Sequence, residues 1–479
     1  MQLRRPLRIV TVCALATSVP MASLGGAAVT RSRLGPMSLA WSFPSIAVDA
    51  QGDPHLLYPS KEDVLHHAWR KGGRWMDEVV DDRFASCSPQ SIAVDIQGRI
   101  HIAYRIESND IVDLEDLVLV HGVRDESGWS TTEVAPGSTT RCLALGLDGR
   151  PRILQKGTSG NLEVQYFDGE TWVPLDTGIP GPKYGTDILT LAVDGEGNDH
   201  ALYVRDGQLL YAEDASGGWQ ETAIAESPML LGALALDEAG RPHVAVSHLG
   251  TGPDDNLLHV WHDGSDWQTE QVFPPRDSSV RMRTMGGILM HSPGHIFVTF
   301  TESKHLHNEW VHFPRVAHFD GVSWREVYTG GPEWLVNTSS AVGPDGSVHA
   351  VYGGLRVQHM KFTLPDLVAE WDGLEAGPAA LGTRALGHLR IRNEGPGASG
   401  TARISFYLSD DGAFDGADEP VGTPRRIGRV PPGRERFVPC SLILPADAAG
   451  RRLLAVVDPD GRLDDIDRPN NTAAALLGE

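Results

Sequence analysis

The chain reads Ser45-Ile-Ala-Val-Asp-Ala-Gln-Gly-Asp-Pro-His-Leu-Leu-Tyr58 near its N-terminus, and it repeats the phrase as Ser91-Ile-Ala-Val-Asp-Ile-Gln-Gly-Arg-Ile-His-Ile-Ala-Tyr104. Seven copies can be recognised, anchored by glycines that follow one another at intervals of 43 to 54 residues: Gly52, Gly98, Gly149, Gly197, Gly240, Gly294 and Gly346. A period near fifty residues is typical of a propeller or another repeat array. This repeat decides the fold.

Each copy contains four short segments that alternate or run apolar, as strands do. The fourth copy is the clearest, with Leu189-Thr-Leu-Ala-Val193, His200-Ala-Leu-Tyr203, Leu209-Leu-Tyr-Ala212 and Trp219-Gln-Glu-Thr-Ala-Ile224. A four-stranded sheet of this size cannot cover its two apolar faces alone, so neighbouring sheets must stack until the ring closes. The sequence therefore predicts an all-β fold with a seven-bladed β-propeller over residues 37–363.

The last copy supplies only three strands, at Ser340–Val342, Val348–Tyr352 and Val357–Phe362. We expect its outer strand to come from the segment before the first copy, Met37-Ser-Leu-Ala-Trp-Ser-Phe43. That pairing would tie the two ends of the ring together.

Three residue types recur at fixed places in most of the copies. The aspartate of an Asp-x-x-Gly turn, as in Asp49 and Gly52, is expected to accept turn amides while the glycine takes a positive φ. A tryptophan at the start of the fourth strand is expected to pack between neighbouring sheets. A histidine in the second strand recurs five times, at His55, His101, His200, His243 and His349. Because these histidines would be spread around a ring, we expect structural hydrogen bonds to backbone rather than a metal site.

Length, charge and the N-terminus narrow the function classes. The 479 residues exceed one ordinary core, and a formal charge of −22 argues against a nucleic-acid partner. Arg4, Arg5 and Arg8 precede a largely apolar stretch, which predicts a signal peptide over residues 1–28 with cleavage near Ala27 or Ala28. No stable membrane span is expected. The predicted location is secreted, extracellular or at the cell surface, with the periplasm as the alternative.

In an oxidising compartment three cysteines would remain, Cys87, Cys142 and Cys440. Cys87 and Cys142 lie at the starts of consecutive copies, so a bridge between them and two unpaired small residues are both open readings. Cys440 is expected to pack in a buried strand.

A resemblance supports the propeller. Asp168-Gly-x-x-Trp172, Asp263-Gly-x-x-Trp267 and Asp320-Gly-x-x-Trp324 resemble the end of the repeat motif in the sialidase-type, Asp-box (BNR-like) superfamily of bacterial propellers. The serine that opens the full motif is missing, so the resemblance implies a fold rather than an activity.

After Phe362 the period stops, and alternating segments such as Ala402–Leu408 and Leu453–Val457 predict a small immunoglobulin-like β-sandwich over residues 365–479. Arg392-Asn-Glu-Gly-Pro396 and Asp458-Pro-Asp-Gly461 resemble the cell-adhesion-related domain found in bacteria, CARDB, which implies an extracellular accessory or adhesive module. No cofactor is expected, apart from a calcium hypothesis for the acidic turn with Asp411, Asp415 and Asp418.

Propeller sites are sought in the irregular loops at the mouth of the ring. The candidate ligand-binding residues there are Arg281, Arg283, Glu302, His305 and Trp334. The predicted function is a non-catalytic binding or adhesion protein that presents this rim to a glycan or an extracellular protein, and no catalytic residue is assigned. The alternative is a sialidase-like or other glycoside hydrolase, which would need an arginine cluster or two carboxylates flanking the bond.

Overall fold

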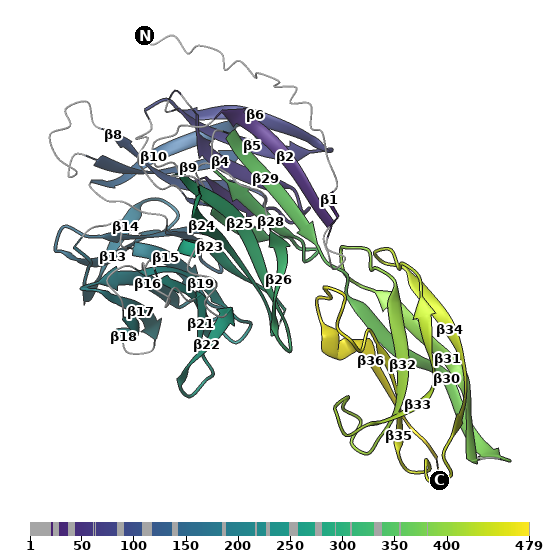
Figure 1. The fold of residues 1–479 in the computed structure, drawn as a ribbon. Coiled ribbons are helices and arrows are strands. Elements are labelled where there is room, and N and C mark those ends of the chain that lie inside the picture. Colours follow the sequence, from purple (N-terminus) through teal and green to yellow (C-terminus); the bar gives the residue numbers. More distant parts are fainter. Residues whose placement is uncertain are drawn as a thin grey trace.

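A computed structural model of the chain places strands along its whole described length, with one short 3-10 helix, η3 (Arg468–Asn471) (Figure 1). The structure describes residues 21–22, 28–36, 44–60, 62, 64–83, 91–107, 117–136, 142–183, 188–215, 218–226, 230–248, 257–273, 280–292, 294–306, 309–329, 338–353, 356–380 and 382–478. Within these ranges no helix is long and apolar enough to cross a membrane. The expectation of an all-β chain built from repeated four-stranded antiparallel sheets is confirmed.

The described residues up to Thr363 form seven antiparallel sheets, numbered here in chain order. Sheet 1 contains β3 (Ser45–Val48), β4 (Pro54–Pro59), β5 (Leu65–Lys71) and β6 (Arg74–Asp81). Sheet 2 contains β7 (Ser91–Val94), β8 (Ile100–Glu107), β9 (Leu117–Asp125) and β10 (Gly128–Pro136). Sheet 3 contains β11 (Leu143–Leu145), β12 (Pro151–Lys156), β13 (Asn161–Phe167) and β14 (Trp172–Pro180). Sheet 4 contains β15 (Ile188–Val193), β16 (Asp199–Arg205), β17 (Gln208–Ala215) and β18 (Gly218–Glu226).

Sheet 5 contains β19 (Leu230–Leu236), β20 (Pro242–His248), β21 (Leu257–His262) and β22 (Trp267–Phe273). Sheet 6 contains β23 (Val280–Ser292), β24 (His295–Leu306), β25 (Glu309–Asp320) and β26 (Trp324–Thr329). Sheet 7 contains β27 (Thr338–Val342), β28 (Val348–Tyr352) and β29 (Arg356–Thr363), joined at its outer edge by β2 (Ala28–Pro36) and the short β1 (Met21–Ala22). The first strand of each sheet contacts the first strand of the next, and β27 of sheet 7 contacts β3 of sheet 1, so the series closes on itself.

The strand that completes sheet 7 corrects one expectation. The outer partner of β29 is β2, in an antiparallel register that pairs Val29 with Phe362 and Arg33 with Gln358 (Figure 1). We predicted Met37–Phe43 for this role, and those residues lie outside the described part of the chain. Val29 and Leu34 are each only 6% exposed and pack on opposite faces of β2, Val29 in the core shared with sheet 6 and Leu34 in the core shared with sheet 1.

The turn between the first and second strands of a sheet forms as the repeat predicts. In sheet 1, Asp49 Oδ1 accepts hydrogen bonds from the amides of Gln51 and Asp53 at 2.9 and 2.8 Å. Gly52 has a φ of 81°, a conformation that suits glycine. The aspartate is therefore structural, as expected.

The recurring tryptophans pack between sheets, as predicted. Trp129 of sheet 2 lies edge-on against His67 of sheet 1, with ring centroids 5.4 Å apart, and its Nε1 donates to Glu78 Oε1 at 2.9 Å. Trp324 of sheet 6 makes the equivalent contacts with sheet 5. Trp75 of sheet 1 packs against His359 of sheet 7, which carries the pattern across the closure of the ring.

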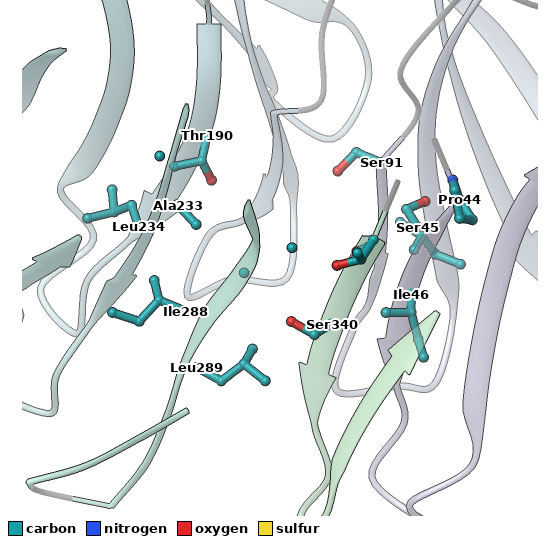
Figure 2. Close-up of a pocket in the computed structure, with 16 residues that line it drawn as sticks. Pro44, Ser45, Ile46, Ser91, Thr190, Ala233, Leu234, Ile288, Leu289 and Ser340 are labelled. Carbon is teal, nitrogen blue, oxygen red and sulfur yellow. The ribbon is translucent and has the colours of Figure 1, made fainter. Parts of the chain in front are cut away.

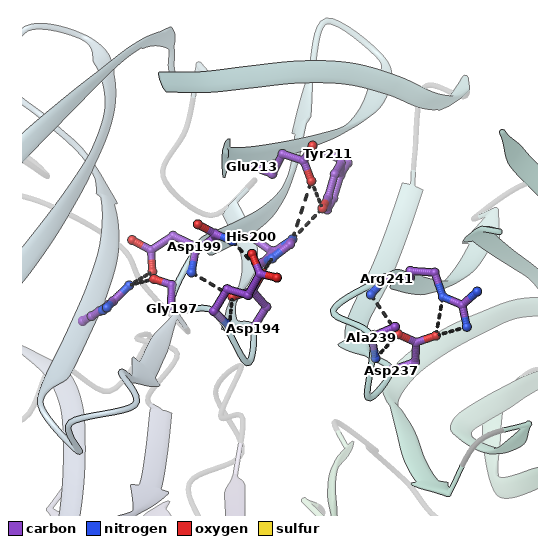
Figure 3. A network of polar contacts seen from close by, with 12 residues as sticks. Asp194, Gly197, Asp199, His200, Tyr211, Glu213, Asp237, Ala239 and Arg241 are labelled. Atoms are coloured by element: carbon purple, nitrogen blue, oxygen red, sulfur yellow. Dashed lines mark hydrogen bonds and ion pairs between the residues drawn. The ribbon is translucent and has the colours of Figure 1, made fainter. Parts of the chain in front are cut away.

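The recurring histidines bond to side chains, which corrects the expectation of backbone partners. His55 Nδ1 lies 3.0 Å from Nε2 of His67 in the neighbouring strand, and His67 Nδ1 lies 3.1 Å from Glu78 Oε1. Four sheets contain such a histidine pair, His55–His67, His101–His121, His243–His259 and His349–His359. In sheet 4 a tyrosine replaces the second histidine of the pair. His200 is hydrogen-bonded to Tyr211, which donates to Glu213, beside the turn that contains Asp194 (Figure 3).

From Leu367 onward the chain forms two further sheets. One has the order β30 (Leu367–Ala379), β31 (Gly382–Asn393), β34 (Glu435–Leu444), and the other β33 (Glu419–Ile427), β32 (Ala402–Ser409), β35 (Arg452–Val457), β36 (Thr472–Leu476). Both sheets contribute to one hydrophobic core, which includes Leu389, Leu442, Phe406 and Leu453. Cys440 is buried in the same core, as expected of a packing residue.

The two-sheet part is attached to sheet 6 of the ring. Arg325 Nη1 donates to the carbonyl oxygens of Gly461 and Leu463 at 2.5 and 3.3 Å, and Arg325 Nε pairs with Asp320 Oδ2 at 2.9 Å. Ile466, 2% exposed, joins a core cluster with Val316 of sheet 6. A buried hydrophobic side chain beside a buried ion pair makes this junction an ordered one.

Replacing Arg325 with alanine is therefore expected to destabilise the protein by about 1–3 kcal/mol, because the carbonyls of Gly461 and Leu463 lose their donor while the buried Asp320 carboxylate keeps only Arg468, 3.4 Å away. Urea denaturation followed by circular dichroism measures the change. The control is Lys361→Ala, which removes a more exposed ion pair with Asp345 and should cost about 0–1 kcal/mol. Equal effects of the two substitutions would contradict the assignment.

Candidate functional site

A cavity of about 320 Å³ lies where the innermost strands of the ring begin (Figure 2). Its walls come from the first strands of six of the seven sheets. The described residues that line it are Pro44, Ser45, Ile46, Ser91, Ile92, Thr190, Gly232, Ala233, Leu234, Gly286, Gly287, Ile288, Leu289, Thr338, Ser339 and Ser340. The surface that faces this cavity is mainly polar, made by backbone and hydroxyl groups, and a volume of this size is large enough for a small ligand.

The polar groups of this cavity are hydroxyls. Ser91, Thr190 and Ser340 come from three different sheets, and their side-chain oxygens are directed toward the space between them (Figure 2). The repeat explains the arrangement, because these residues stand at or near the start of an innermost strand, where the strands converge on the axis of the ring. Residues that are far apart in the sequence are thus brought to one site.

Two of the lining hydroxyls have no hydrogen-bond partner among the described residues, namely Ser45 Oγ and Thr338 Oγ1. Ser45 is 9% exposed, so its hydroxyl is largely removed from bulk water. Both oxygen atoms are almost fully enclosed by protein, so they lie in the packed wall behind the surface that a ligand would touch, where a buried polar group without a partner costs free energy.

Two consecutive glycines allow sheets 6 and 7 to approach each other beside the cavity. A Cβ atom on Gly287 would lie 2.6 Å from Ser340 Oγ, and one on Gly286 would collide with Thr338 Oγ1. Ser340 Oγ is in turn hydrogen-bonded to Thr299 Oγ1 at 2.8 Å. The glycines therefore leave room for a cluster of hydroxyls at the seam between the two sheets.

No ionisable side chain occurs among the described residues that line the cavity. His55 and His349 lie within the sheets rather than in the cavity wall, and burial lowers the pKa of each to about 4. The chemistry that the described walls offer is therefore hydrogen bonding and apolar contact, without acid–base groups.

Four of the five predicted ligand-binding residues lie on sheet 6, whose innermost strand β23 lines the cavity. Strands β23, β24 and β25 of sheet 6 are 12 or 13 residues long, and they extend beyond the cavity on the side where the innermost strands begin. Arg281 and Arg283 lie in β23, Glu302 and His305 in β24, and Arg283 stands directly opposite Glu302 in the register. Trp334 lies outside the described residues.

Glu302 is engaged inside the sheet. Its side chain is 1% exposed, and Arg315 Nε donates to its Oε2 at 2.9 Å. Arg315 Nη1 also donates to Glu326 Oε1 at 3.0 Å, so one guanidinium joins two carboxylates. This network stabilises the extension of sheet 6, and it explains how charged residues are accommodated within the sheet.

The acidic turn of the calcium hypothesis uses its carboxylates locally. Asp411 Oδ1 accepts from the amide of Ala413 at 2.9 Å, Asp415 Oδ1 accepts from Ala417 at 2.7 Å, and Asp418 Oδ2 accepts from Asp415 at 2.8 Å. Across the described ranges no group of three or more His, Cys, Asp or Glu side chains is arranged to hold a metal ion. The calcium site therefore stays a prediction.

The cavity residues were not among the sequence-based candidates. Their signal was present in the repeat itself, since the serine that opens Ser45-Ile-Ala-Val48 and Ser91-Ile-Ala-Val94 is a small polar residue at the start of a buried strand. Cys142 is buried one residue before β11, while Cys87 lies outside the described residues, so a bridge between them also stays a prediction.

No known protein family and no curated protein matches the sequence. Among solved structures, the chain is similar to an ulvan lyase of polysaccharide lyase family PL25, with 14% identity, coverage of 71% of this chain and 95% of that chain, and a TM-score of 0.50. It also resembles the BP39L lectin from Burkholderia pseudomallei (15% identity, 67% and 97% coverage, TM-score 0.46) and AofleA from Arthrobotrys oligospora (15%, 64% and 91%, 0.43). At these identities the likeness concerns the fold, which is of the β-propeller type.

Proposed function

We propose that the seven sheets are the blades of a seven-bladed β-propeller, that residues 365–479 form an immunoglobulin-like domain of the CARDB type, and that the protein binds a glycan at the mouth of the propeller. The cyclic order of the innermost strands supports the propeller. A three-stranded sheet and a four-stranded sheet that share one hydrophobic core support the sandwich. The domain boundary is proposed between Thr363, where β29 ends, and Leu367, where β30 begins.

The observation that carries the binding function is the convergence of hydroxyls from separate sheets on one cavity. Hydroxyl groups both donate and accept hydrogen bonds, as the hydroxyls of a sugar do. The surface of the cavity is mainly polar, which suits such a ligand. The ulvan lyase and the BP39L lectin, whose structures this chain resembles, are carbohydrate-active by their names, which agrees with the proposal.

The proposal includes export. A signal peptide cleaved after Ala27 or Ala28 would leave β2 to begin the mature chain, so that the strand completing sheet 7 is retained. The mature protein would then act outside the cytoplasm, at the cell surface or in the medium. N-terminal sequencing of the exported protein tests this step, and a start beyond Pro36 would contradict it.

A glycan array probed with the full chain tests the binding function. The variant Thr190→Phe places a large ring at the cavity wall and is expected to lower retention at least about tenfold, because the ligand and the ring compete for the same volume. The matched control is Thr132→Phe, the same substitution at an exposed position of β10. Equal retention by both variants, on an array that retains the unmodified chain, would place the ligand outside this cavity.

The glycoside hydrolase alternative is tested on the same glycans. Hydrolysis requires two suitably placed carboxyl groups or an equivalent pair, and the described cavity walls supply none. We therefore expect the glycans to be retained intact. Product release detected by mass spectrometry would support the hydrolase instead.

A further inference from the structure

We infer that the Asp53–Pro54 peptide bond, in the first turn of the ring, cleaves itself in mildly acidic solution through attack of the Asp53 carboxyl group on its own backbone carbonyl carbon. The bond lies between β3 and the first residue of β4 in sheet 1. The reaction is independent of glycan binding, and it would divide the chain inside the sheet at which the ring closes.

An aspartate that precedes a proline has a chemistry that other residues lack. Its carboxyl group is held permanently close to the following carbonyl carbon, which makes the attack unimolecular. A bond forms between a carboxyl oxygen of Asp53 and that carbon, the C–N bond breaks, and the carboxyl proton ends on the Pro54 nitrogen. Because this nitrogen belongs to a tertiary amide without an N–H, it leaves as a basic secondary amine. The cyclic anhydride on Asp53 then takes up water and opens to two carboxyl groups.

Only the first of the seven equivalent turns combines aspartate and proline at this place. Sheets 3 and 5 have Arg150–Pro151 and Arg241–Pro242 there, and sheet 2 has Arg99–Ile100. The backbone hydrogen bond that closes the turn is the same in all four sheets, at 2.9 to 3.0 Å. The fold therefore does not require a carboxyl group at position 53.

The turn holds the Asp53–Pro54 bond in a reactive setting. The Asp53 carbonyl oxygen accepts a hydrogen bond from the Asp49 amide at 3.0 Å, and this donor would stabilise the negative charge that develops on the oxygen during attack. No described residue donates a hydrogen bond to the Asp53 carboxyl oxygens. Gly52 and Asp53 are partly exposed, so water can reach the anhydride.

The reaction needs the acid form of Asp53, because its proton passes to the leaving nitrogen. Burial raises the pKa of the Asp53 carboxyl, and the nearby Asp49 carboxylate raises it further. His55 Nε2 lies 3.4 Å from Asp49 Oδ2. Three cations lower the Asp53 pKa in part: Arg70, Lys71 and Lys361, the last of which is paired with Asp345. Since the raised pKa prevails, the cleavage rate should increase as the pH falls through it and become constant below it.

A second Asp–Pro bond in the chain, Asp458–Pro459, provides an internal reference. Asp458 is 6% exposed, and its Oδ2 accepts a hydrogen bond from the Leu463 amide at 2.7 Å. That hydrogen bond fixes the carboxylate on Leu463 and competes with attack on the Asp458 carbonyl carbon. We therefore expect this bond to be stable in the folded protein.

Cleavage would leave the ring assembled from two chains. The N-terminal piece contains β2, which pairs with β29 of sheet 7, and β3, which pairs with β4 of sheet 1. Its side chains Val29, Leu34 and Ile46 are buried in cores shared with the rest of the ring. The strand that completes sheet 7 would then be held by non-covalent contacts alone, and the pieces would separate only on unfolding.

The test incubates the full chain in acidic and neutral buffer and measures intact masses after denaturation. We expect one piece that ends at Asp53 and one that begins at Pro54, formed at least about tenfold faster at about pH 5 than at about pH 7.5, since the acid fraction of a carboxyl falls about tenfold per pH unit above its pKa. Cleavage at Asp458–Pro459 in the same sample should be at least about tenfold slower. Hydroxylamine should trap the anhydride as a hydroxamate on Asp53, which distinguishes self-cleavage from a contaminating protease.

Two variants copied from the equivalent turns are the matched controls. Asp53→Arg reproduces the turns of sheets 3 and 5, and Pro54→Ile reproduces the proline-free turn of sheet 2. Both should retain the circular dichroism spectrum of the unmodified chain, and both should stay uncleaved. An unmodified chain that remains intact at about pH 5, equal cleavage of the two Asp–Pro bonds, or continued cleavage in Asp53→Arg would overturn the inference.

Discussion

Replacement of Leu34 by alanine is expected to lower the free energy of unfolding by about 2–5 kcal/mol, the range for deleting a buried leucine side chain. Leu34 is 6% exposed in β2, the N-terminal strand that completes sheet 7. It belongs to a core cluster that contains Ile46 and Leu56 of sheet 1 together with Val351 of sheet 7. The substitution therefore creates a cavity at the position where the last sheet meets the first.

Urea denaturation followed by tryptophan fluorescence measures this effect. The matched control is Arg33→Ala in the same strand, which removes an exposed side chain and should change the stability by less than about 0.5 kcal/mol. Because β2 connects the N-terminus to the C-terminal repeat, we also expect a less cooperative transition for Leu34→Ala. Identical unfolding curves for the two variants would show that β2 does not hold the ring closed.

Stability is expected to fall as the pH is lowered from about 6.5 to about 4. Burial lowers the pKa of His55, His243 and His349 to about 4, and that of His121 to about 3, whereas the ordinary histidine pKa is 6.5. Between these values the unfolded chain binds more protons than the folded one, so protons favour unfolding. Above about pH 6.5 the histidines contribute no such penalty, and below the folded pKa the penalty no longer grows.

The size of the effect follows from the pKa difference. A lowering to about 4 corresponds to on the order of 3 kcal/mol for each imidazole, and several imidazoles are affected. Since paired rings influence one another's titration, the contributions should not simply add. Urea midpoints measured across this pH range at constant ionic strength give the slope.

A non-titrating variant identifies the source of the slope. His243→Gln keeps a donor and an acceptor near His259 but does not titrate in this range, so the stability of this variant should depend less steeply on pH, by about one proton. The exposed His388 on β31 provides the matched control, His388→Gln, which should leave the slope unchanged. A wild-type slope in His243→Gln would assign the acid sensitivity to other groups.

The repeat made the ring of sheets predictable, because period, strand pattern and turn chemistry all recur in the local sequence. The Asp49 turn and the packing of Trp129 followed directly from that repetition. The second histidine of each pair could also have been found, since His67, His121, His259 and His359 recur in the third strand. It was overlooked because its role depends on side-chain register across two strands, which a one-dimensional repeat does not display.

Other features depend on closure of the ring and could not be found in local sequence. Among its described side chains the closing strand buries two apolar ones, Val29 and Leu34, so its pattern is weak beside the more apolar segment that precedes it. The cavity combines single residues from six sheets, and none of those residues is unusual in its own strand. Sequence reasoning directed attention to charged loop residues, whereas the described cavity is neutral.

The tryptophan contacts give the ring a rotational direction. Trp129 covers a ring of the sheet before it, Trp324 does the same, and Trp75 covers the last sheet. The described strands of sheet 7 contain no tryptophan, and its seam with sheet 6 is filled by Gly286, Gly287 and the hydroxyls of Ser340 and Thr299 instead. The joints are therefore not interchangeable, and a unit gained or lost beside sheet 7 would leave mismatched faces in contact.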